Sequence, residues 1–273
     1  MFDFHIHLAR LPQKQQLTQL LCDRNYNFVA IACEPWEWDE LSQLKKEFST
    51  DLKPIKVSYG LHPMIATEVT DGILAKLRAR IEDDELAMVG EAGIDKRYPG
   101  YDDGTQDRLF IEQAKLALEF KRDLQIHCVG DYQRILKLLT EAGFLQDFAI
   151  GPNARQLQTL TRLQDTCRPI FHRFGGDANF VKKALPYGAF FSLHMDSFRK
   201  KSTAAAITLI PQERVFFETD ADETFIRDNN NVIQNAVKDP VTVSESNITA
   251  EEILAELEKR LESVRAAYVE CCQ

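Results

Sequence analysis

The chain has 273 residues, of which 44% are hydrophobic and 27% are charged, with a formal net charge of −9. This composition is typical of a soluble globular protein, and α/β barrels reach this length without splitting, so one domain over residues 1–273 is expected. The acidic balance argues against a broad basic surface that grips duplex DNA, although a local pocket could still hold an anion.

The sequence has no apolar run long enough to span a bilayer and no signal-peptide pattern at its start, so we expect a cytoplasmic protein without membrane association. Its six cysteines include no Cys-x-x-Cys pair, which argues against a zinc ribbon or a disulfide framework.

The first eight residues combine strand alternation with two imidazoles. Alternation places His5, His7 and Asp3 on one face of a strand, and the opposite face then carries Phe2, Phe4, Ile6 and Leu8. Two imidazoles on one rigid strand suit a divalent metal ion. A buried strand whose histidines bond to backbone would show the same pattern.

Apolar segments of strand length alternate with segments of helical periodicity along the rest of the chain. Strands are predicted at residues 1–8, 28–33, 55–59, 86–89, 124–127, 169–172, 189–193 and 215–218. Helices are predicted at residues 17–25, 37–48, 72–82, 106–121, 131–141, 177–185, 203–210 and 249–267, with a weaker patch at 155–164 and an irregular segment at 220–247. This alternation predicts an α/β fold, a (β/α)₈ TIM barrel.

All six histidines lie at the carboxyl ends of predicted strands: His5, His7, His62, His127, His172 and His194. Glu91 and Asp220 follow the fourth and the eighth strand. The carboxyl ends of barrel strands converge on the face where active sites are built, so we expect these side chains to meet. Imidazoles and carboxylates suit two divalent ions, and Glu91 is the natural bridge because a carboxylate offers two oxygens and a negative charge.

Six short motifs resemble the TatD family of metal-dependent deoxyribonucleases, which have amidohydrolase-like barrels. The matching pieces are Asp3-Phe4-His5-Ile6-His7, Gly60-Leu61-His62-Pro63, Gly90-Glu91-Ala92-Gly93-Ile94-Asp95, Ile126-His127, Phe171-His172-Arg173-Phe174-Gly175-Gly176 and Glu218-Thr219-Asp220-Ala221. The resemblance implies a first metal ion held by His5, His7, Glu91 and Asp220, and a second held by Glu91, His127 and His172. It also implies that His62 contacts a substrate phosphate and that Asp220 accepts the proton of the attacking water.

The chain departs from the family pattern in three loops. Asp222-Glu223-Thr224-Phe225 stands where the family usually has proline and an aromatic-aliphatic stretch. The usual Arg and Asn-x-Pro segment is blurred into residues 226–231, and the loop after the seventh strand, commonly Ser with a nearby glycine, reads Phe191-Ser192-Leu193-His194-Met195-Asp196. These loops would shape the pocket, so the departures bear on the substrate more than on the metal ligands.

Four further residues could reach a substrate. His194 shares strand parity with Ser192, and a structural hydrogen bond is its alternative role. Arg173 could contact a phosphate or form a surface salt bridge. Trp36 and Trp38 could stack on a base or make a hydrophobic contact at a helix start. Cys128 points away from His127 and is assigned to packing.

The sequence therefore predicts a two-metal hydrolase that cleaves phosphodiesters in nucleic acid, DNA above all, or in a small phosphoester. A hydrolase of a carboxyl ester, lactone or amide on the same metal ions remains open, as does a barrel that binds a partner without catalysis. The ligand chemistry leaves Mg²⁺, Mn²⁺ and Zn²⁺ open: histidines favour a transition metal, whereas the resemblance implies magnesium. The sequence does not indicate an oligomeric state.

Overall fold

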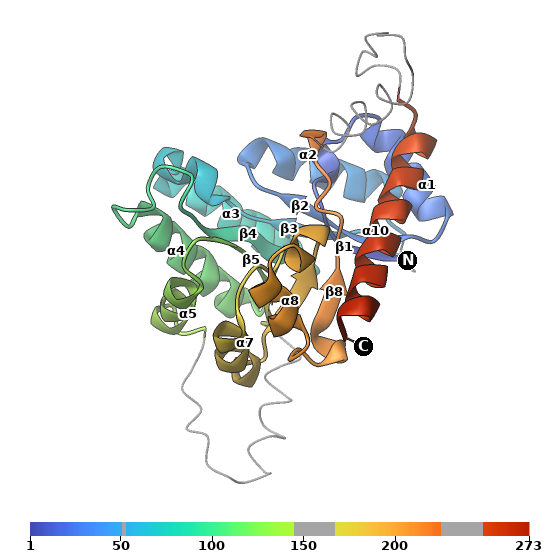
Figure 1. The fold of residues 1–273 in the computed structure, drawn as a ribbon. Helices are drawn as coiled ribbons and strands as arrows, with labels where there is room; N and C mark the ends of the chain where they lie inside the picture. The colour runs from blue at the N-terminus through green and yellow to red at the C-terminus, as the bar shows by residue number, and fades with distance from the viewer. Residues whose placement is uncertain (51–52, 145–166, 225–247, 273) are drawn as a thin grey trace, which may run out of the picture.

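Eight parallel strands form a single sheet in the chain order β1 to β8, and helices surround it (Figure 1). The computed structural model describes residues 1–50, 53–144, 167–224 and 248–272. The end of β1 meets the segment that follows β8 through an isolated parallel bridge between Ile6 and Ala221, and the His7 N–H donates to the Ala221 carbonyl at 2.9 Å. The predicted (β/α)₈ barrel is confirmed.

The strands are β1 (Phe2–Ile6), β2 (Asn27–Ala32), β3 (Lys56–Tyr59), β4 (Met88–Asp95), β5 (Leu124–Val129), β6 (Pro169–Phe171), β7 (Phe190–Leu193) and β8 (Val215–Phe217). The α-helices are α1 (Lys14–Asp23), α2 (Pro35–Phe48), α3 (Asp71–Asp83), α4 (Thr105–Phe120), α5 (Tyr132–Glu141), α7 (Ala178–Ala184), α8 (Lys201–Ile207) and α10 (Ala250–Cys272). Short 3₁₀ helices are η1 (Leu8–Arg10), η2 (Pro63–Glu68), η3 (Leu185–Tyr187), η4 (Met195–Phe198) and η5 (Gln212–Arg214). The helical patch predicted at 155–164 and most of the irregular segment at 220–247 lie outside the described residues.

Several helices begin where the sequence supplies a polar cap. The Asp131 carboxylate accepts from the backbone N–H groups of Gln133 and Arg134 at the start of α5, and Asp177 caps α7 in the same way. Such side chains satisfy backbone donors that the first helical turn leaves without partners. The last helix, α10, runs five residues beyond its predicted end and lies alongside α1 (Figure 1).

The fourth strand is longer than the glycines in its sequence suggest, since β4 continues from Val89 through Asp95. A Cβ at Gly93 would lie 1.8 Å from the His127 carbonyl oxygen, and one at Gly90 would lie 2.4 Å from that of Gln125. The glycines therefore mark close backbone approach between β4 and β5, not the end of a strand. As a result Glu91 lies within the sheet.

The first strand does not keep the predicted alternation, because its pairing with β2 shifts register between Asp3 and Ile6. Phe4 packs inside the barrel in a cluster with Val29, Ile31, Met88 and Ile170. Ile6 belongs to the other apolar cluster, which also contains buried helix residues. The prediction that these two side chains share one face with Phe2 and Leu8 is therefore wrong, since a register shift interrupts the two-residue period.

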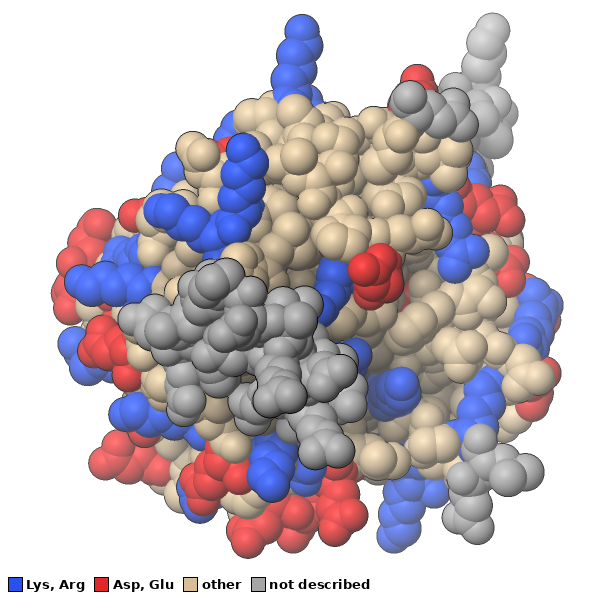
Figure 2. All heavy atoms as spheres, turned by 90° about the horizontal axis from the view of Figure 1, so that it is seen from below, with Lys and Arg blue, Asp and Glu red and all other residues tan. Residues whose placement is uncertain are grey.

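The face seen in Figure 2 carries both signs of charge: Lys and Arg lie beside Asp and Glu around its rim, and charged side chains of both signs also lie near its centre. In the described part of the chain, no helix is both long enough and apolar enough to cross a bilayer.

Candidate active site

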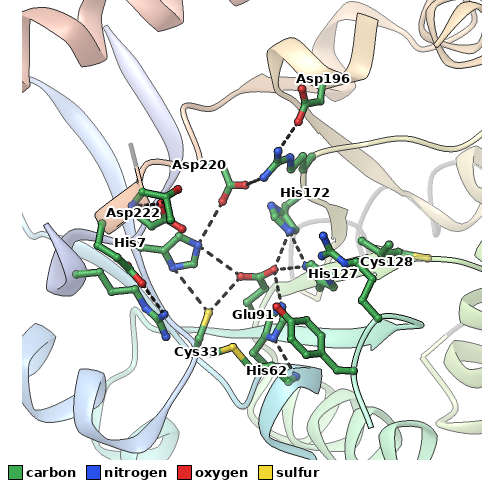
Figure 3. A pocket seen from close by; sticks show the side chains of 18 residues that line it. His7, Cys33, His62, Glu91, His127, Cys128, His172, Asp196, Asp220 and Asp222 are labelled. Atoms are coloured by element: carbon green, nitrogen blue, oxygen red, sulfur yellow. Dashed lines mark hydrogen bonds and ion pairs between the residues drawn. The ribbon is translucent and has the colours of Figure 1, made fainter. Parts of the chain in front are cut away.

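A cavity of about 590 Å³ opens where the strands end, at the mouth of the barrel (Figure 3). Most of the residues predicted for the site line it: His7, His62, Glu91, His127, His172, Arg173 and Asp220. His5 lies beneath them and is fully buried. The structure thus brings together side chains that are more than 200 positions apart in the sequence.

Glu91 stands at the centre of the site, and its two oxygens face two different pairs of histidines. The Oε2 atom lies 3.4 Å from His5 Nε2 and 3.7 Å from His7 Nε2. The Oε1 atom lies 2.7 Å from His172 Nε2 and 2.5 Å from His127 Nδ1. One carboxylate therefore joins both halves of the cluster (Figure 3).

Asp220 completes the half of the cluster that contains the first two histidines. Its Oδ1 atom lies 3.3 Å from His7 Nε2 and 3.6 Å from His5 Nε2. The Asp220 backbone N–H donates to the His5 carbonyl at 3.0 Å, which ties the residue to the end of β1. Its other oxygen, Oδ2, accepts from Arg173 Nη1 at 2.6 Å.

The residues fit a divalent cation in both halves. Nitrogen and oxygen ligands about 2.0–2.2 Å from one zinc ion lie roughly 2.9–3.5 Å apart, close to the separations around Glu91 and Asp220. His5 Nε2 is buried and has no hydrogen-bond partner among the described residues, although it faces both carboxylates. A buried ring nitrogen without a partner is costly, and a cation between it and the carboxylates would remove that cost.

Two of the histidines form a hydrogen bond through the ring nitrogen that does not face Glu91. The His127 Nε2 atom lies 3.0 Å from Asp95 Oδ2, and the His5 Nδ1 atom lies 3.0 Å from Gln125 Oε1. Each acceptor favours the tautomer with its proton on that nitrogen, which leaves the other nitrogen's lone pair facing Glu91. Metal-binding histidines are commonly oriented in this way.

Sequence reasoning assigned no role to four residues of this site: Cys33, Asp95, Gln125 and Glu218. Asp95 and Glu218 are inside quoted motifs, and Gln125 shares strand parity with His127. Cys33 directly follows β2, so the rule that singled out the histidines would also have found it. Its Sγ lies 3.3 Å from Glu91 Oε2, and burial with neighbouring carboxylates raises its pKa well above the ordinary value.

The buried charges of the site compensate one another. Burial by itself would raise the pKa of Glu91, but His172 and His127 hold it well below its usual range. Burial likewise opposes the ionised form of Asp220, whose pKa His7 and the other imidazoles hold well below the ordinary value. Burial would lower the pKa of His172, but Glu91 and Glu218 raise it well above the ordinary value. Cations could replace the shared protons of these pairs.

His62 differs from the other histidines at the mouth in its hydrogen bonding and its pKa. Its Nδ1 accepts from the Met64 backbone N–H at 3.0 Å, so the neutral ring carries its proton on Nε2. Burial, together with the charge of His127, lowers the pKa of His62 to about 3, which keeps the ring neutral. Nε2 lies 3.7 Å from Glu91 Oε1, so His62 presents a hydrogen-bond donor to the cavity.

Arg173 crosses the mouth of the site. Its guanidinium forms ion pairs with Asp220 and with Asp196, and its backbone has a φ of +43°. The backbone N–H donates to Glu218, which fixes the turn after β6. The His194 ring lies beside this ion pair, next to Asp196, but is not among the described residues that line the cavity. It caps η4 by accepting from the Asp196 N–H at 3.2 Å.

The two tryptophans lie in different surroundings. Trp38 is buried in the core and donates from Nε1 to the Gly60 carbonyl at 3.0 Å. Trp36 is 48% exposed, and the Arg10 guanidinium lies 5.8 Å from the centre of its ring. Cys128 is buried at the cavity wall.

The family description "TatD related DNase" matches residues 2–264. A protein of Cronobacter turicensis described as a 3'-5' ssDNA/RNA exonuclease TatD is 26% identical over 172 residues, which are 62% of this chain and 58% of that one. An uncharacterized metal-dependent hydrolase of Buchnera aphidicola is 22% identical over 236 residues, which are 81% of this chain and 80% of that one. The match to the Cronobacter protein thus spans less than two thirds of that relative's length.

Solved structures share the fold over almost the whole chain. An uncharacterized amidohydrolase from Saccharomyces cerevisiae has a TM-score of 0.67 at 18% identity, covering 99% of this chain and 94% of that one. A TatD homologue from Escherichia coli has a TM-score of 0.62 at 17% identity, covering 97% of each chain.

Proposed function

Because the chain belongs to the TatD-related DNase family, we propose that it is a hydrolase that uses two divalent metal ions to cleave phosphodiester bonds in nucleic acid. The observation that carries this proposal is the position of Glu91, whose two oxygens face two separate histidine pairs. A shared carboxylate between two sets of nitrogen ligands is the arrangement that a two-metal site requires.

The ligands would divide between the two ions according to which oxygen of Glu91 they lie near. His5, His7, Asp220 and one oxygen of Glu91 would hold the first ion. His127, His172 and the other oxygen of Glu91 would hold the second. When bound, such ions lower the pKa of a coordinated water and neutralise charge on phosphate oxygens. Mg²⁺, Mn²⁺ and Zn²⁺ are the candidates.

Asp220 would accept the proton of the attacking water. In the free protein its Oδ2 accepts a hydrogen bond from Arg173, which opposes proton uptake at that oxygen. A substrate phosphate at the mouth would compete for the guanidinium, whose side chain is 45% exposed and can turn towards it. Phosphate binding would thereby free Oδ2 to act as the base.

Two further groups would hold the substrate. The Nε2–H of His62 points into the cavity as a donor for a phosphate oxygen. The imidazole ring stays neutral because its pKa is about 3. His194 would act at the outer edge of the site, where its ring lies 3.5 Å from Asp196, a residue that also pairs with Arg173.

The substrate we propose is single-stranded nucleic acid. The reacting groups are deeply buried, with Glu91 2% and His5 0% exposed, so a phosphodiester must enter the cavity to reach them. A flexible strand end can do this, whereas the middle of a stiff duplex cannot. The Cronobacter relative is described as an exonuclease of ssDNA and RNA, which agrees with this choice.

The experiment that tests the function compares a labelled single-stranded oligonucleotide with a panel of lactones and carboxyl esters, each with Mn²⁺, Mg²⁺, Zn²⁺ or chelator. We expect metal-dependent shortening of the oligonucleotide and no metal-dependent turnover of the panel. Turnover of a lactone or ester without any cleavage of nucleic acid would overturn the proposal.

A further inference from the structure

A thiol lies in the half of the site that would hold the first metal ion. Cys33 follows β2 at the mouth of the barrel and is 3% exposed. Its Sγ lies 3.3 Å from Glu91 Oε2 and 3.7 Å from His7 Nδ1 (Figure 3). These three residues form one of the groups whose possible ligand atoms all lie within 4.8 Å of one another.

The separation of the sulfur from the carboxylate fits shared coordination. Sulfur lies about 2.3 Å and oxygen about 2.1 Å from a zinc ion, so the two atoms are roughly 3.1–3.6 Å apart for angles between 90° and tetrahedral. The Sγ–Oε2 distance of 3.3 Å falls inside this range. The buried His5 Nε2, which has no hydrogen-bond partner in the described chain, faces the same oxygen from 3.4 Å.

We propose that Cys33 is a thiolate ligand of the first metal ion and makes this half of the site select Zn²⁺ or another thiophilic ion over Mg²⁺. The inference rests on the metal centre of the proposed function. Thiolates bind Zn²⁺ and Co²⁺ well, whereas Mg²⁺ prefers oxygen. On binding, the thiol loses its proton to solvent through the open cavity, and sulfur forms one bond to the ion.

Charge balance favours the thiolate once an ion is present. Two divalent ions bring four positive charges, against which Glu91 and Asp220 supply only two negative ones, so a thiolate reduces the excess.

Cys128 provides the matched control. It is also buried at the cavity wall, directly after the proposed ligand His127. Its side chain lies away from the cluster in Figure 3 and belongs to none of the candidate ligand groups among the described residues. A change at Cys128 therefore removes a buried thiol from the same wall without removing a ligand.

The experiment is a Co²⁺ titration of the metal-free protein, read by absorption spectroscopy. We expect a sulfur-to-cobalt charge-transfer band in the near ultraviolet that Cys33→Ser loses and Cys128→Ser keeps. Competition with a chelating dye should show that the affinity for Zn²⁺ is about tenfold or more weaker in Cys33→Ser, which is the usual loss when a contact at a metal site is removed. The affinity for Mn²⁺ should change little. No band in the natural protein, or a band that survives Cys33→Ser, would overturn the inference.

If Cys33→Ser does not fold, ¹¹³Cd NMR of the natural protein decides the question. A cadmium resonance shifted downfield by a sulfur ligand supports the inference, and resonances typical of nitrogen and oxygen ligands alone overturn it. The spectra are independent of turnover. A cobalt–sulfur band without phosphodiesterase activity would defeat the proposed function only, and activity without the band would defeat only the role of Cys33.

Discussion

The two ends of the barrel interior bury different kinds of side chain: one end buries apolar side chains, and the other buries charged and polar ones. At one end Phe4 stacks on Phe216 with ring centres 3.9 Å apart, and Phe190 stacks on the same ring at 5.5 Å. Val29 and Ile170, both fully buried, belong to the same apolar cluster. Burial of this kind stabilises the fold without help from any ligand.

The mouth of the barrel instead buries carboxylates and imidazoles within a few ångströms of one another. Glu91 is 2% exposed, and His5 keeps a ring nitrogen that no described residue satisfies. Buried charges are costly even when they are paired, so this end contributes less to folding than the apolar end. The comparison teaches that one end holds the barrel together by itself, while the other, by our proposal, needs cations to balance its charges.

The largest effect is expected at the mouth. Glu91→Ala removes the carboxylate shared by both histidine pairs, so turnover should fall on the order of a thousandfold or more, beyond the loss of a single preorganised group. The apolar end remains, so the protein should still fold. Initial rates of oligonucleotide cleavage and thermal melting measure the two effects. Glu119→Ala, which removes an exposed partner of Arg78, is the control and should keep full activity. Full activity in Glu91→Ala would contradict the two-metal site.

The second prediction concerns the apolar end of the barrel interior. Phe4→Ala should lower the free energy of unfolding by about 3–5 kcal/mol, because it removes a buried ring and leaves a cavity. The metal content per folded molecule should stay the same, since the ring contacts Phe216 and Phe2 and lies outside the ligand cluster. Urea denaturation and elemental analysis check the two statements. Loss of metal with unchanged stability would mean that the two ends are not separate.

A smaller effect is expected for Asp95, which hydrogen-bonds the proposed metal ligand His127. In Asp95→Asn the amide can rotate to donate to His127 Nε2 and so favour the wrong tautomer, which should weaken metal binding about 10- to 100-fold. Isothermal titration with Zn²⁺ gives the affinity. Asp103→Asn is the control, because that exposed carboxylate accepts from Thr105 and is not among the described residues that line the cavity. Equal affinities in the two variants would show that Asp95 does not orient the ring.

The smallest effect concerns substrate contact. Arg173→Lys keeps the charge but loses the planar fork, so KM for the oligonucleotide should rise about tenfold, the lower range for a charged hydrogen bond. Steady-state kinetics separate this from kcat. Arg199→Lys changes a more exposed partner of Asp196 and should leave KM unaltered. An unchanged KM in Arg173→Lys would place Arg173 outside the substrate contacts.

The barrel and the central residues of the site could be predicted because both depend on local pattern. Strand and helix periodicity indicated the eight repeats, and the rule that barrel sites form at strand ends singled out the histidines together with Glu91 and Asp220. The same rule did not separate His62, a donor, from the proposed ligands. That distinction depends on which ring nitrogen meets the Met64 backbone N–H.

The sequence by itself determined the order of strands and helices and the residue types that reach the mouth, because periodicity and strand ends are properties of neighbouring residues. Only the tertiary structure decided that β1 shifts register after Asp3, that β4 continues through Gly90, and that Cys33 approaches Glu91. These features arise when the sheet closes into a barrel, since closure sets the distances between strands and a one-dimensional pattern carries no such distances.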